Sequence, residues 1–366
     1  MQICIDISQI VYPGGVARYA RELVSNLLEI DSNNEYILFG SSLRQQKTLK
    51  KFITSLKPKN SHLTPKLYPI PPTVLEFIFN QIHFSIDPFI GKVDVLHTSD
   101  WTEPKSKATK VTTIHDLAVF KFPKQFHPKI VEVHKRKLEW VRSECAKIIA
   151  VSENTKTDII EFLKIPPEKI VVIYEAASKI FQPKSRQEQE KIKNKFGVKK
   201  NYILTVATKG ARKNLARLFE TFGQLRKDFD LNLVVVGDIE VSNGRDFIVT
   251  GFLADEDLAV LYSGSKVFVY PSLYEGFGLP VVEAMACGTP VVCSNISSLP
   301  EVGGKAAVYV DPTNTGDIQR GIKMVLNLPG EEYLALKKKS LEQAREFSWE
   351  KTAQQTLKLY QEVVNS

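Results

Sequence analysis

Cysteine is scarce in this 366-residue sequence, which contains four. Cys4, Cys145, Cys287 and Cys293 are scattered along the chain, and their spacing matches neither a zinc site nor a redox-active pair. Most of them lie among apolar residues, where a free cysteine behaves as a small buried hydrophobic residue. We therefore expect buried free thiols and a protein that works in the reducing cytoplasm.

Long apolar runs and a dinucleotide fingerprint are also missing. No stretch reaches the roughly 20 residues that a membrane-spanning helix requires, and the opening MQICIDISQI lacks the features of a signal peptide. The first glycine pair, Gly14 and Gly15, departs from GxGxxG, which disfavours an oxidoreductase. With 43% hydrophobic residues the chain can still form the cores of two ordinary domains.

Acidic residues are absent from residues 41–75, and the net charge of +8 is unevenly distributed. Residues 1–180 contain 25 lysines and arginines against 19 aspartates and glutamates (+6), whereas the remainder contains 24 against 22 (+2). A basic face of this kind could contact anionic lipid or an acidic acceptor, or it could be an ordinary solvated surface. No nucleic-acid-binding motif accompanies the charge, so nucleic acid is not an expected partner.

The most informative stretch is KVFVYPSLYEGFGLPVVEAMACGTPVV, residues 266–292. It predicts a strand over 266–271, a glycine-containing loop over 272–279, a helix over 281–287 and a second strand over 289–293. This order predicts a right-handed βαβ unit. The N–H groups of the loop precede a helix N-terminus, where orphan donors and the helix dipole favour a bound phosphate.

Two glutamates bracket this loop, Glu275 within it and Glu283 eight positions later in the helix. A carboxylate at each end of a bound diphosphate could accept hydrogen bonds from the hydroxyls of a ribose and of a sugar, which is the layout of a nucleoside diphosphate sugar. A glycine-rich turn with two solvated glutamates is the alternative. The phosphate donors would be the backbone N–H groups of Gly276, Phe277, Gly278 and Leu279.

The stretch PSLYEGFGLPVVEAMACGTPVV resembles the donor-binding signature of retaining glycosyltransferases of the glycosyltransferase family 4 type. The resemblance extends over nearly the whole chain. It implies the GT-B architecture, in which two doubly wound parallel α/β domains face a central cleft. It also implies transfer of a hexose from a nucleotide sugar to an acceptor hydroxyl with retained configuration, in which Glu275 would hold the hydroxyls of the donor sugar and Glu283 those of the ribose.

The first predicted domain, residues 1–180, is the acceptor side in this family. In the resembling family a glycine loop faces the cleft at this point, so Gly15 is expected near the donor phosphates. Arg18 and Tyr19 could reach the cleft, with Arg18 on the acceptor side. VTTIHDL matches the family's TIHD segment, which implies that His115 contacts the sugar or the leaving group and that Asp116 orients its ring or faces the acceptor.

Residues 61–72 of this domain are predicted as a proline-broken loop. Residues 74–90 could be a core helix or an acceptor-side flap. The second domain, over 185–348, is expected to bind the donor. A last helix over 350–366 is expected to pack back on the first domain.

The segment ATKGARKNLARLFETF places Arg212 and Lys213 just before a helix that Asn214 could cap. Two cations beside a helix N-terminus can clamp a diphosphate, and the segment resembles the family's RKN element. Many members carry an arginine five residues before this lysine. Because Thr208 occupies that position here, either Arg212 or Lys209 could supply the second charge.

The turn at Phe252 is where the family holds the base through backbone contacts. The RKN segment looks most like mannosyltransferase members, so GDP-mannose is the first donor to consider, while the base (GDP or UDP) and the sugar stay open. No DxD-like site stands in the right place, so neither a metal nor another cofactor is expected. The expected acceptor is a glycan or a lipid-linked glycan of polysaccharide biosynthesis, with possible peripheral contact at the inner membrane face.

Preorganised donors aimed at the departing diphosphate would supply the main catalytic effect, at roughly 2.7–4 kcal/mol for one donor. A nucleotide-sugar epimerase and a non-catalytic sugar-nucleotide binding protein remain as alternatives. Labelled donor separates the three, because transfer, isomerisation and binding give different products.

Overall fold

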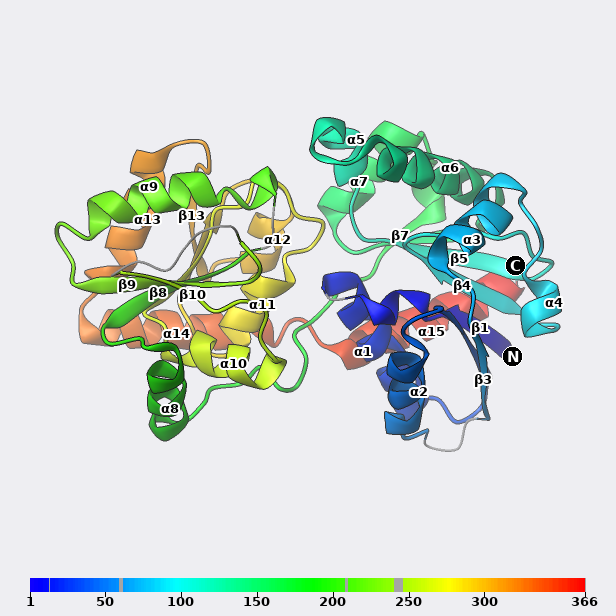
Figure 1. Ribbon diagram of the computed structural model, residues 1–366, viewed down its shortest axis with the longest axis horizontal. Helices are drawn as coiled ribbons and strands as arrows, with labels where there is room; N and C mark the ends of the chain where they lie inside the picture. The colour runs from blue at the N-terminus through cyan, green and yellow to red at the C-terminus, as the bar shows by residue number, and fades with distance from the viewer. Residues whose placement is uncertain (13, 59–61, 208–209, 240–245, 366) are drawn as a thin grey trace. The chain divides into compact units, whose positions relative to one another are not determined.

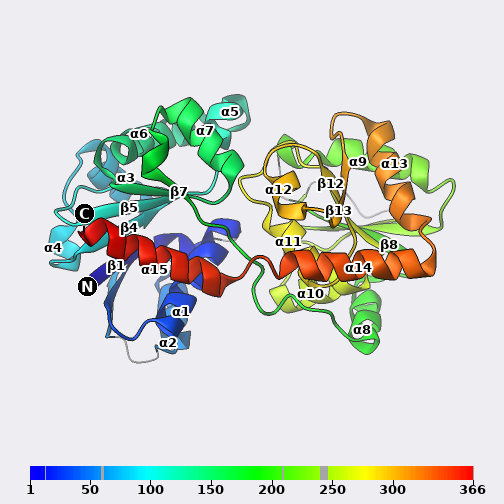
Figure 2. The same cartoon turned by 180° about the vertical axis from the view of Figure 1, so that it is seen from behind.

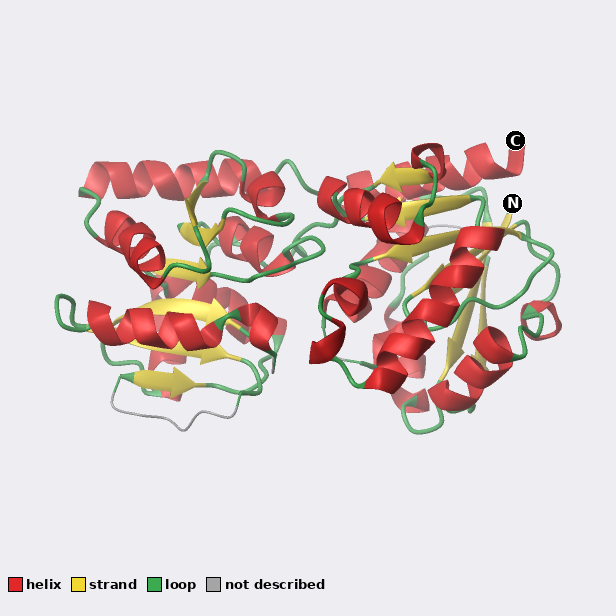
Figure 3. Cartoon of the chain, turned by 90° about the horizontal axis from the view of Figure 1, so that it is seen from above, coloured by secondary structure: helices red, strands yellow, loops and turns green. Residues whose placement is uncertain are grey.

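The computed structural model describes residues 1–12, 14–58, 62–207, 210–239 and 246–365. The chain divides into two compact units, Met1–Glu175 together with the segment from Trp349 onward, and Ala176–Ser348. Each unit contains one parallel sheet, of seven strands in the first and six in the second. Figure 3 shows the strands of each unit as a layer between helices. The predicted fold class, two doubly wound α/β domains, is confirmed.

The first unit places β1 inside its sheet, third from the β3 edge. Its strands are β1 (Gln2–Asp6), β2 (Glu35–Ser41), β3 (Leu63–Tyr68), β4 (Val95–Ser99), β5 (Thr109–Ile114), β6 (Lys147–Ala150) and β7 (Ile170–Val172). They are ordered β3-β2-β1-β4-β5-β6-β7. Its helices are α1 (Gly15–Ile30), α2 (Gln46–Ser55), α3 (Pro72–Glu76), α4 (Asp87–Ile90), α5 (Ala118–Lys121), α6 (Pro128–Glu144), α7 (Glu153–Leu163) and α15 (Trp349–Asn365). Figures 1 and 2 show α1, α2 and α15 on one face and α5, α6 and α7 on the other.

The second unit repeats this plan. Its strands are β8 (Asn201–Val206), β9 (Leu231–Val236), β10 (Phe247–Val249), β11 (Val267–Tyr270), β12 (Val291–Ser294) and β13 (Ala307–Val310). They are ordered β10-β9-β8-β11-β12-β13. Its helices are α8 (Arg186–Phe196), α9 (Leu215–Leu225), α10 (Asp255–Gly264), α11 (Leu279–Ala286), α12 (Leu299–Gly303), α13 (Thr315–Leu326) and α14 (Gly330–Ala344). In Figure 1, α9 and α13 cover one face, and α10 and α14 the other.

Local sequence explains several helix ends. Ser152 caps α7, because its hydroxyl accepts a hydrogen bond from the Thr155 N–H at 3.0 Å, as predicted. Ser185 and Glu188 form a capping box at the start of α8. Gly288 follows α11 with a φ of 71°, the left-handed conformation that stops a helix at little cost for glycine.

The prediction of a loop over residues 61–72 is wrong, because β3 forms within it. β3 pairs with β2 in parallel register, with Pro65 opposite Leu38. In the sheet order β3 is an edge strand with one neighbour. A proline, which lacks a backbone N–H, is tolerated on such an edge, so Pro65 does not break the strand.

Residues 74–90 form short helical pieces rather than one helix: α3, a π-helical turn over Phe77–Gln81, and α4. Leu75, Phe79 and Ile90 are buried in the core, which agrees with the core interpretation. In the same segment, however, Phe77, Ile82 and Phe84 are about half exposed.

The last helix, α15, belongs to the first unit. Its Tyr360 hydroxyl hydrogen-bonds Nδ1 of the buried His97, and the Thr352 hydroxyl donates to the Tyr174 carbonyl at 2.7 Å.

The four cysteines are free and buried, as expected. Among the described residues, no helix combines the length and the apolar character needed to cross a bilayer.

Candidate functional site

Two loops meet at the carboxyl end of the second sheet. β8 and β11 are hydrogen-bonded neighbours, although the chain first runs outward from β8 through β9 and β10. The strand order therefore reverses between β8 and β11, and the carboxyl ends at such a reversal are where open α/β sheets bind ligands. The loop after β8 contains the 3₁₀ turn Ala211–Lys213, and the loop after β11 contains Glu275.

Lys213 and Glu275 form an ion pair between these two loops. The Lys213 Nζ lies 2.7 Å from Glu275 Oε1, and the two side chains are 19% and 12% exposed. Lys213 Nζ also donates to the Tyr270 hydroxyl at 2.6 Å, and the Ser272 hydroxyl donates to Glu275 Oε1. The sequence placed these two residues 62 positions apart, and the fold brings their charged atoms into contact.

The charge states of this cluster follow from its contacts. Burial alone would raise the pKa of the Glu275 carboxyl, but the Lys213 charge and hydrogen bonds from Lys213, Ser272 and Tyr270 outweigh burial, so the pKa is lowered. Burial first, and then the Glu275 charge, hold the pKa of Tyr270 well above its usual value. At neutral pH the site therefore presents an ionised Glu275 carboxylate and a neutral Tyr270 phenol.

Two serines hold the loop that begins at Glu275. The Ser297 hydroxyl donates to the Glu275 carbonyl at 2.6 Å and accepts from the Glu275 N–H at 3.1 Å. The Ser298 hydroxyl donates to the Phe277 carbonyl at 2.7 Å. The loop is thus fixed by side chains from the connection after β12, which rigidifies its backbone N–H groups before any ligand arrives.

Gly278 precedes α11 and needs to be glycine for two reasons. Its φ is 109°, a conformation that other residues rarely adopt. A Cβ at this position would also lie 2.7 Å from Leu299 Cδ2. Gly278 is the N-cap residue of α11, and Leu279 is its first residue. The predicted phosphate donors, the N–H groups of Gly276, Phe277, Gly278 and Leu279, therefore lie just before and at the start of this helix.

Glu283 lies in α11 and is 1% exposed. The Tyr262 hydroxyl donates to its Oε2 at 3.2 Å. The structure thus places this second glutamate in a buried environment, unlike the partly open Glu275. Its contact with a ribose stays a prediction.

Arg212 ties the two loops together through its backbone. Its carbonyl accepts hydrogen bonds from the Ser272 hydroxyl at 3.0 Å and from the Leu273 N–H at 2.7 Å. Its side chain is half-buried. The structure does not test whether Arg212 or Lys209 supplies the second positive charge, because Thr208 and Lys209 lie outside the described residues.

Asn214 does not cap α9 with its side chain, contrary to the prediction. It occupies the N-cap position with a φ of 57°. Its Nδ2 instead donates to the carbonyls of Pro271 and Pro312, at 3.0 and 2.6 Å. The side-chain amide fits here because its N–H₂ group has two donors, one for each carbonyl, and the bond to Pro271 joins the loop after β8 to the end of β11.

Phe252, the predicted base-side residue, is 61% exposed in the turn after β10. Its neighbour Gly251 bridges to Gly237 at the end of β9, where the Gly237 N–H donates to the Gly251 carbonyl at 2.9 Å. The turn is therefore anchored at the same carboxyl edge of the sheet as Lys213 and Glu275.

The remaining predicted residues lie in the first unit. His115 follows β5, and its Nδ1 lies 3.0 Å from Glu175 Oε1, which orients the ring. Asp116 Oδ1 accepts from the Ala118 N–H at 2.8 Å and so shapes the turn that starts α5. Gly15 is the first residue of α1, and Arg18, one turn later, is half-buried.

Tyr19 does not reach outward as the sequence suggested. It is 1% exposed, and its hydroxyl lies 2.9 Å from Thr113 Oγ1. Its ring contacts His115 edge-on, with 4.7 Å between ring centroids. Burial raises the pKa of Tyr19 above its usual range. Tyr19 therefore packs beneath His115.

Sequence reasoning missed several supporting residues. Tyr270 and Ser272 contact the Lys213–Glu275 pair directly, and Ser297 and Ser298 hold the loop. Ser272 stands in the PS of the signature, which was a usable signal. Ser297 and Ser298 lie 22 and 21 residues downstream of the residues whose carbonyls they bind, Glu275 and Phe277, and no local pattern connects them to the loop.

Comparisons with known proteins agree with this geometry. A family model described as Glycosyltransferase Family 4 matches residues 13–177, and one described as Glycosyl transferases group 1 matches residues 186–343. The chain is 30% identical to "O-antigen chain mannosyltransferase B" of Escherichia coli, over 98% of this chain and 99% of that protein.

Solved structures with the same fold cover the whole chain. A glycosyltransferase from Rickettsia africae has a TM-score of 0.74 at 20% identity, over 99% of this chain and 98% of the other. Anabaena Alr3699/HepE, solved in complex with UDP-glucose, has a TM-score of 0.73 at 15% identity, over 99% and 100%. None of these matches favours the epimerase or the non-catalytic alternative. The chain therefore belongs to glycosyltransferase family 4 and is a glycosyltransferase with the GT-B fold.

Proposed function

We propose that this glycosyltransferase transfers mannose from GDP-mannose to a hydroxyl group of a glycan acceptor, with retained configuration. The observation that carries the proposal is the Lys213–Glu275 pair at the reversal of strand order, beside the loop that leads into α11. The choice of mannose is supported by the relative from Escherichia coli, whose name describes an O-antigen chain mannosyltransferase.

In the proposed reaction, the bond between the sugar C1 and the diphosphate oxygen breaks and a bond between C1 and the acceptor oxygen forms. The acceptor proton passes to the departing diphosphate. Lys213, Arg212 and the N–H groups at the start of α11 stabilise the negative charge that grows on the diphosphate. Glu275 holds hydroxyls of the donor sugar, Glu283 those of the ribose, and His115 the sugar or the leaving group.

A donor panel tests the base and the sugar. The panel contains GDP-mannose, UDP-glucose, GDP and UDP, and the measurement is the shift in melting temperature. A donor at 100 times its Kd stabilises the folded state by about 2.7 kcal/mol, which corresponds to a shift of roughly 5–11 °C for a domain of this size. A shift with UDP-glucose and none with GDP-mannose would replace the proposed donor.

The carboxylate of Glu275 is tested by Glu275→Ala and Glu275→Gln. We expect transfer of labelled mannose to be nearly abolished in the alanine variant. We expect it to be reduced roughly 10–150-fold in the glutamine variant, because a hydrogen bond to a charged group contributes about 1.5–3 kcal/mol. Glu332→Gln, on the exposed first turn of α14, is the matched control. Wild-type rates in Glu275→Gln would remove Glu275 from the donor site.

We also propose that transfer needs no divalent metal, since Lys213 and Arg212 can supply the positive charge that a metal supplies elsewhere. We expect the rate to be unchanged by excess EDTA and by added Mg²⁺ or Mn²⁺. A rate that falls with EDTA and returns with Mn²⁺ would contradict this.

For the acceptor, we propose a lipid-linked glycan reached by peripheral contact with an anionic membrane. The support is the +6 charge of residues 1–180 and the exposed side chains of Phe77, Ile82 and Phe84, which are 49%, 58% and 48% exposed. Sedimentation with phosphatidylglycerol vesicles should be weakened by Phe77→Ser but not by Leu334→Ser, an exposed leucine on α14. Equal sedimentation of both variants would exclude this surface.

A further inference from the structure

Glu175 is a buried carboxylate that the proposed reaction does not use. It is the last residue of the first unit before the chain enters the second. Its Oε1 lies 3.0 Å from His115 Nδ1, and the side chains of Glu175 and His115 are 5% and 13% exposed. Burying a carboxylate costs free energy unless it is paired or hydrogen-bonded, so the contact with His115 compensates for the burial of Glu175.

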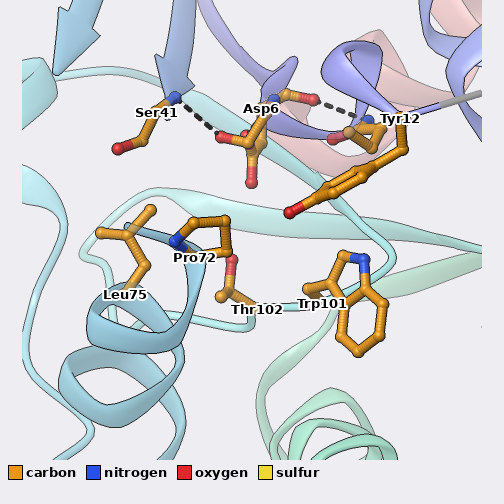
Figure 4. A pocket seen from close by; sticks show the side chains of 9 residues that line it. Asp6, Tyr12, Ser41, Pro72, Leu75, Trp101 and Thr102 are labelled. Carbon is orange, nitrogen blue, oxygen red and sulfur yellow. Dashed lines mark hydrogen bonds between the residues drawn. The ribbon is translucent and has the colours of Figure 1, made fainter. Parts of the chain in front are cut away.

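His115 stands at the edge of the first sheet where open α/β folds bind ligands. β1 and β4 are neighbours, although the chain runs from β1 outward to β2 and β3 first, so the strand order reverses between them. Figure 4 shows the carboxyl edge at this reversal, where Asp6 at the end of β1 and Trp101 after β4 border a small pocket. β5 pairs with β4, and His115 directly follows β5. The histidine is therefore one strand away from the reversal, at the same edge.

The backbone that leads into Glu175 is held on two sides. The Ile173 N–H donates to the Ala150 carbonyl at 3.0 Å, which continues the pairing of β7 with β6. The Tyr174 carbonyl accepts from the hydroxyl of Thr352, a residue of α15, at 2.7 Å. The sheet and the last helix thus give the Glu175 carboxylate a defined position, as a group that orients another side chain requires.

Tyr19 confines the His115 ring from a second side. The two rings meet edge-on, with 4.7 Å between their centroids, and the Tyr19 hydroxyl is itself held by Thr113 Oγ1 at 2.9 Å. Burial first, and the Glu175 charge as well, raise the pKa of Tyr19 above its usual range, so Tyr19 stays a neutral phenol beside the carboxylate. One aromatic contact and one polar contact therefore set the orientation of the ring.

The contact with Glu175 also decides which ring nitrogen of His115 carries the proton. An ionised carboxylate has only hydrogen-bond acceptors, so the proton of this contact lies on Nδ1. In a neutral imidazole the other nitrogen, Nε2, is then an acceptor. An acceptor suits a sugar hydroxyl, which can donate, and it does not suit the departing diphosphate, whose oxygens are themselves acceptors.

We propose that Glu175 is a positioning residue for the transfer reaction: it holds His115 in the Nδ1–H tautomer, so that Nε2 accepts a hydrogen bond from a hydroxyl of the donor sugar. This inference rests on the proposed function, in which His115 contacts the sugar or the leaving group, and it selects the sugar. No motif in the sequence pointed to Glu175, because 60 positions separate it from His115.

NMR of ¹⁵N-labelled histidine rings in the full chain measures the tautomer without any ligand. The spectra are recorded at pH 8, above the ordinary histidine pKa of about 6.5, and the His115 signal is identified by its loss in His115→Asn. We expect one ring proton, on Nδ1, in the wild-type protein. Glu175→Leu, which removes the acceptor, should reduce the Nδ1–H population by at least half. Glu161→Gln, at an exposed position of α7, is the matched control and should leave the signal unchanged.

The rate test is release of GDP from GDP-mannose, with water in place of the acceptor. The bond between C1 and the diphosphate oxygen breaks, the water oxygen bonds to C1, and one water proton passes to the diphosphate. We expect Glu175→Leu to lower kcat roughly 10–150-fold, the factor for losing one hydrogen bond to a charged group. Glu175→Gln, whose amide oxygen can still accept from Nδ1–H, should lower kcat less than about fivefold. In a His115→Ala background Glu175→Leu should have no further effect, because Glu175 acts through His115.

The outcomes separate this inference from the proposed function. If the wild-type protein releases no GDP, the result counts against the proposed donor, and the ring measurement still decides on Glu175. The wild-type ring state needs no variant, so the test stands even where Glu175→Leu does not fold. A ring proton on Nε2 or on both nitrogens in the wild-type protein overturns the inference, and so does an unchanged ring state in Glu175→Leu.

Three kinetic results would also overturn it. The first is a kcat of Glu175→Gln as low as that of Glu175→Leu, because a retained acceptor should rescue a positioning role. The second is an equal effect of Glu175→Leu with and without His115. The third is a wild-type kcat in His115→Ala, in which case the proposed donor stands and Glu175 has no reacting group to position.

Discussion

The Lys213–Glu275 pair should be coupled in stability as well as in catalysis. Each side chain is less than one fifth exposed, and the charged atoms are 2.7 Å apart. Removing one partner of a buried ion pair leaves the other charge uncompensated, at about 3–5 kcal/mol, while replacing both is often close to neutral. We therefore expect Lys213→Met and Glu275→Gln each to lower the free energy of unfolding, and the double variant to be no worse than the poorer single one.

The assay is a double-mutant cycle by urea unfolding. The three tryptophans, Trp101, Trp140 and Trp349, all lie in the first unit, so their fluorescence follows that unit, whereas far-UV circular dichroism follows both. The two single variants and the double variant should shift the unfolding transition of the second unit, which circular dichroism detects and tryptophan fluorescence does not. The coupling energy should lie at about 0.5–3 kcal/mol, the range for residues in contact.

The pH dependence gives the same pair a second readout. The folded pKa of Glu275 is lowered, so its stabilising contribution is fully present above the unfolded value of about 4.3 and is lost as pH falls through the folded pKa. Glu275→Gln should remove this part of the acid dependence. Additive single-variant effects, or an unchanged acid profile in Glu275→Gln, would refute the reasoning.

Three further perturbations test the structure. Gly278→Ala should destabilise the second unit and reduce donor binding, because of its positive φ and the 2.7 Å approach of Leu299; Gly330→Ala, with open space around it, is the control in thermal unfolding. Burial lowers the pKa of His97 to about 3. The fold therefore accommodates neutral His97, and the free energy of unfolding should fall by about 2 kcal/mol from pH 7.5 to pH 5. An NMR titration should show that the His97 ring stays neutral at pH 5. Protonation of the ring with a pKa near 6.5 would contradict this prediction. Asn214→Asp should lower the free energy of unfolding in urea by about 1–3 kcal/mol or more, because an aspartate cannot donate to the two proline carbonyls. An unchanged free energy of unfolding would mean that these two hydrogen bonds contribute little.

Errors in the sequence interpretation have identifiable physical causes. Residues 61–72 contain prolines and were predicted as a loop, but Pro65 sits on an edge strand that needs no N–H on its open side. Tyr19 follows a glycine loop and was predicted near a ligand, but the helical period turns it into the core beside Thr113. Asn214 was predicted as a cap because of its position, but two distant carbonyls compete for its amide.

The sequence by itself determined the alternation of strands and helices, the glycine loop before α11 and the identity of the charged residues, because these depend on local periodicity, turn chemistry and a contiguous signature. The tertiary structure decided that Lys213 and Glu275 are partners, that Ser297 and Ser298 hold the loop, and that Asp6 and Trp101 share a pocket. Each of these contacts joins segments that are distant in the sequence, and the Lys213–Glu275 pair and the Asp6–Trp101 pocket lie where the sheet order reverses. Strand order is set by packing of the whole domain, and no local pattern encodes it.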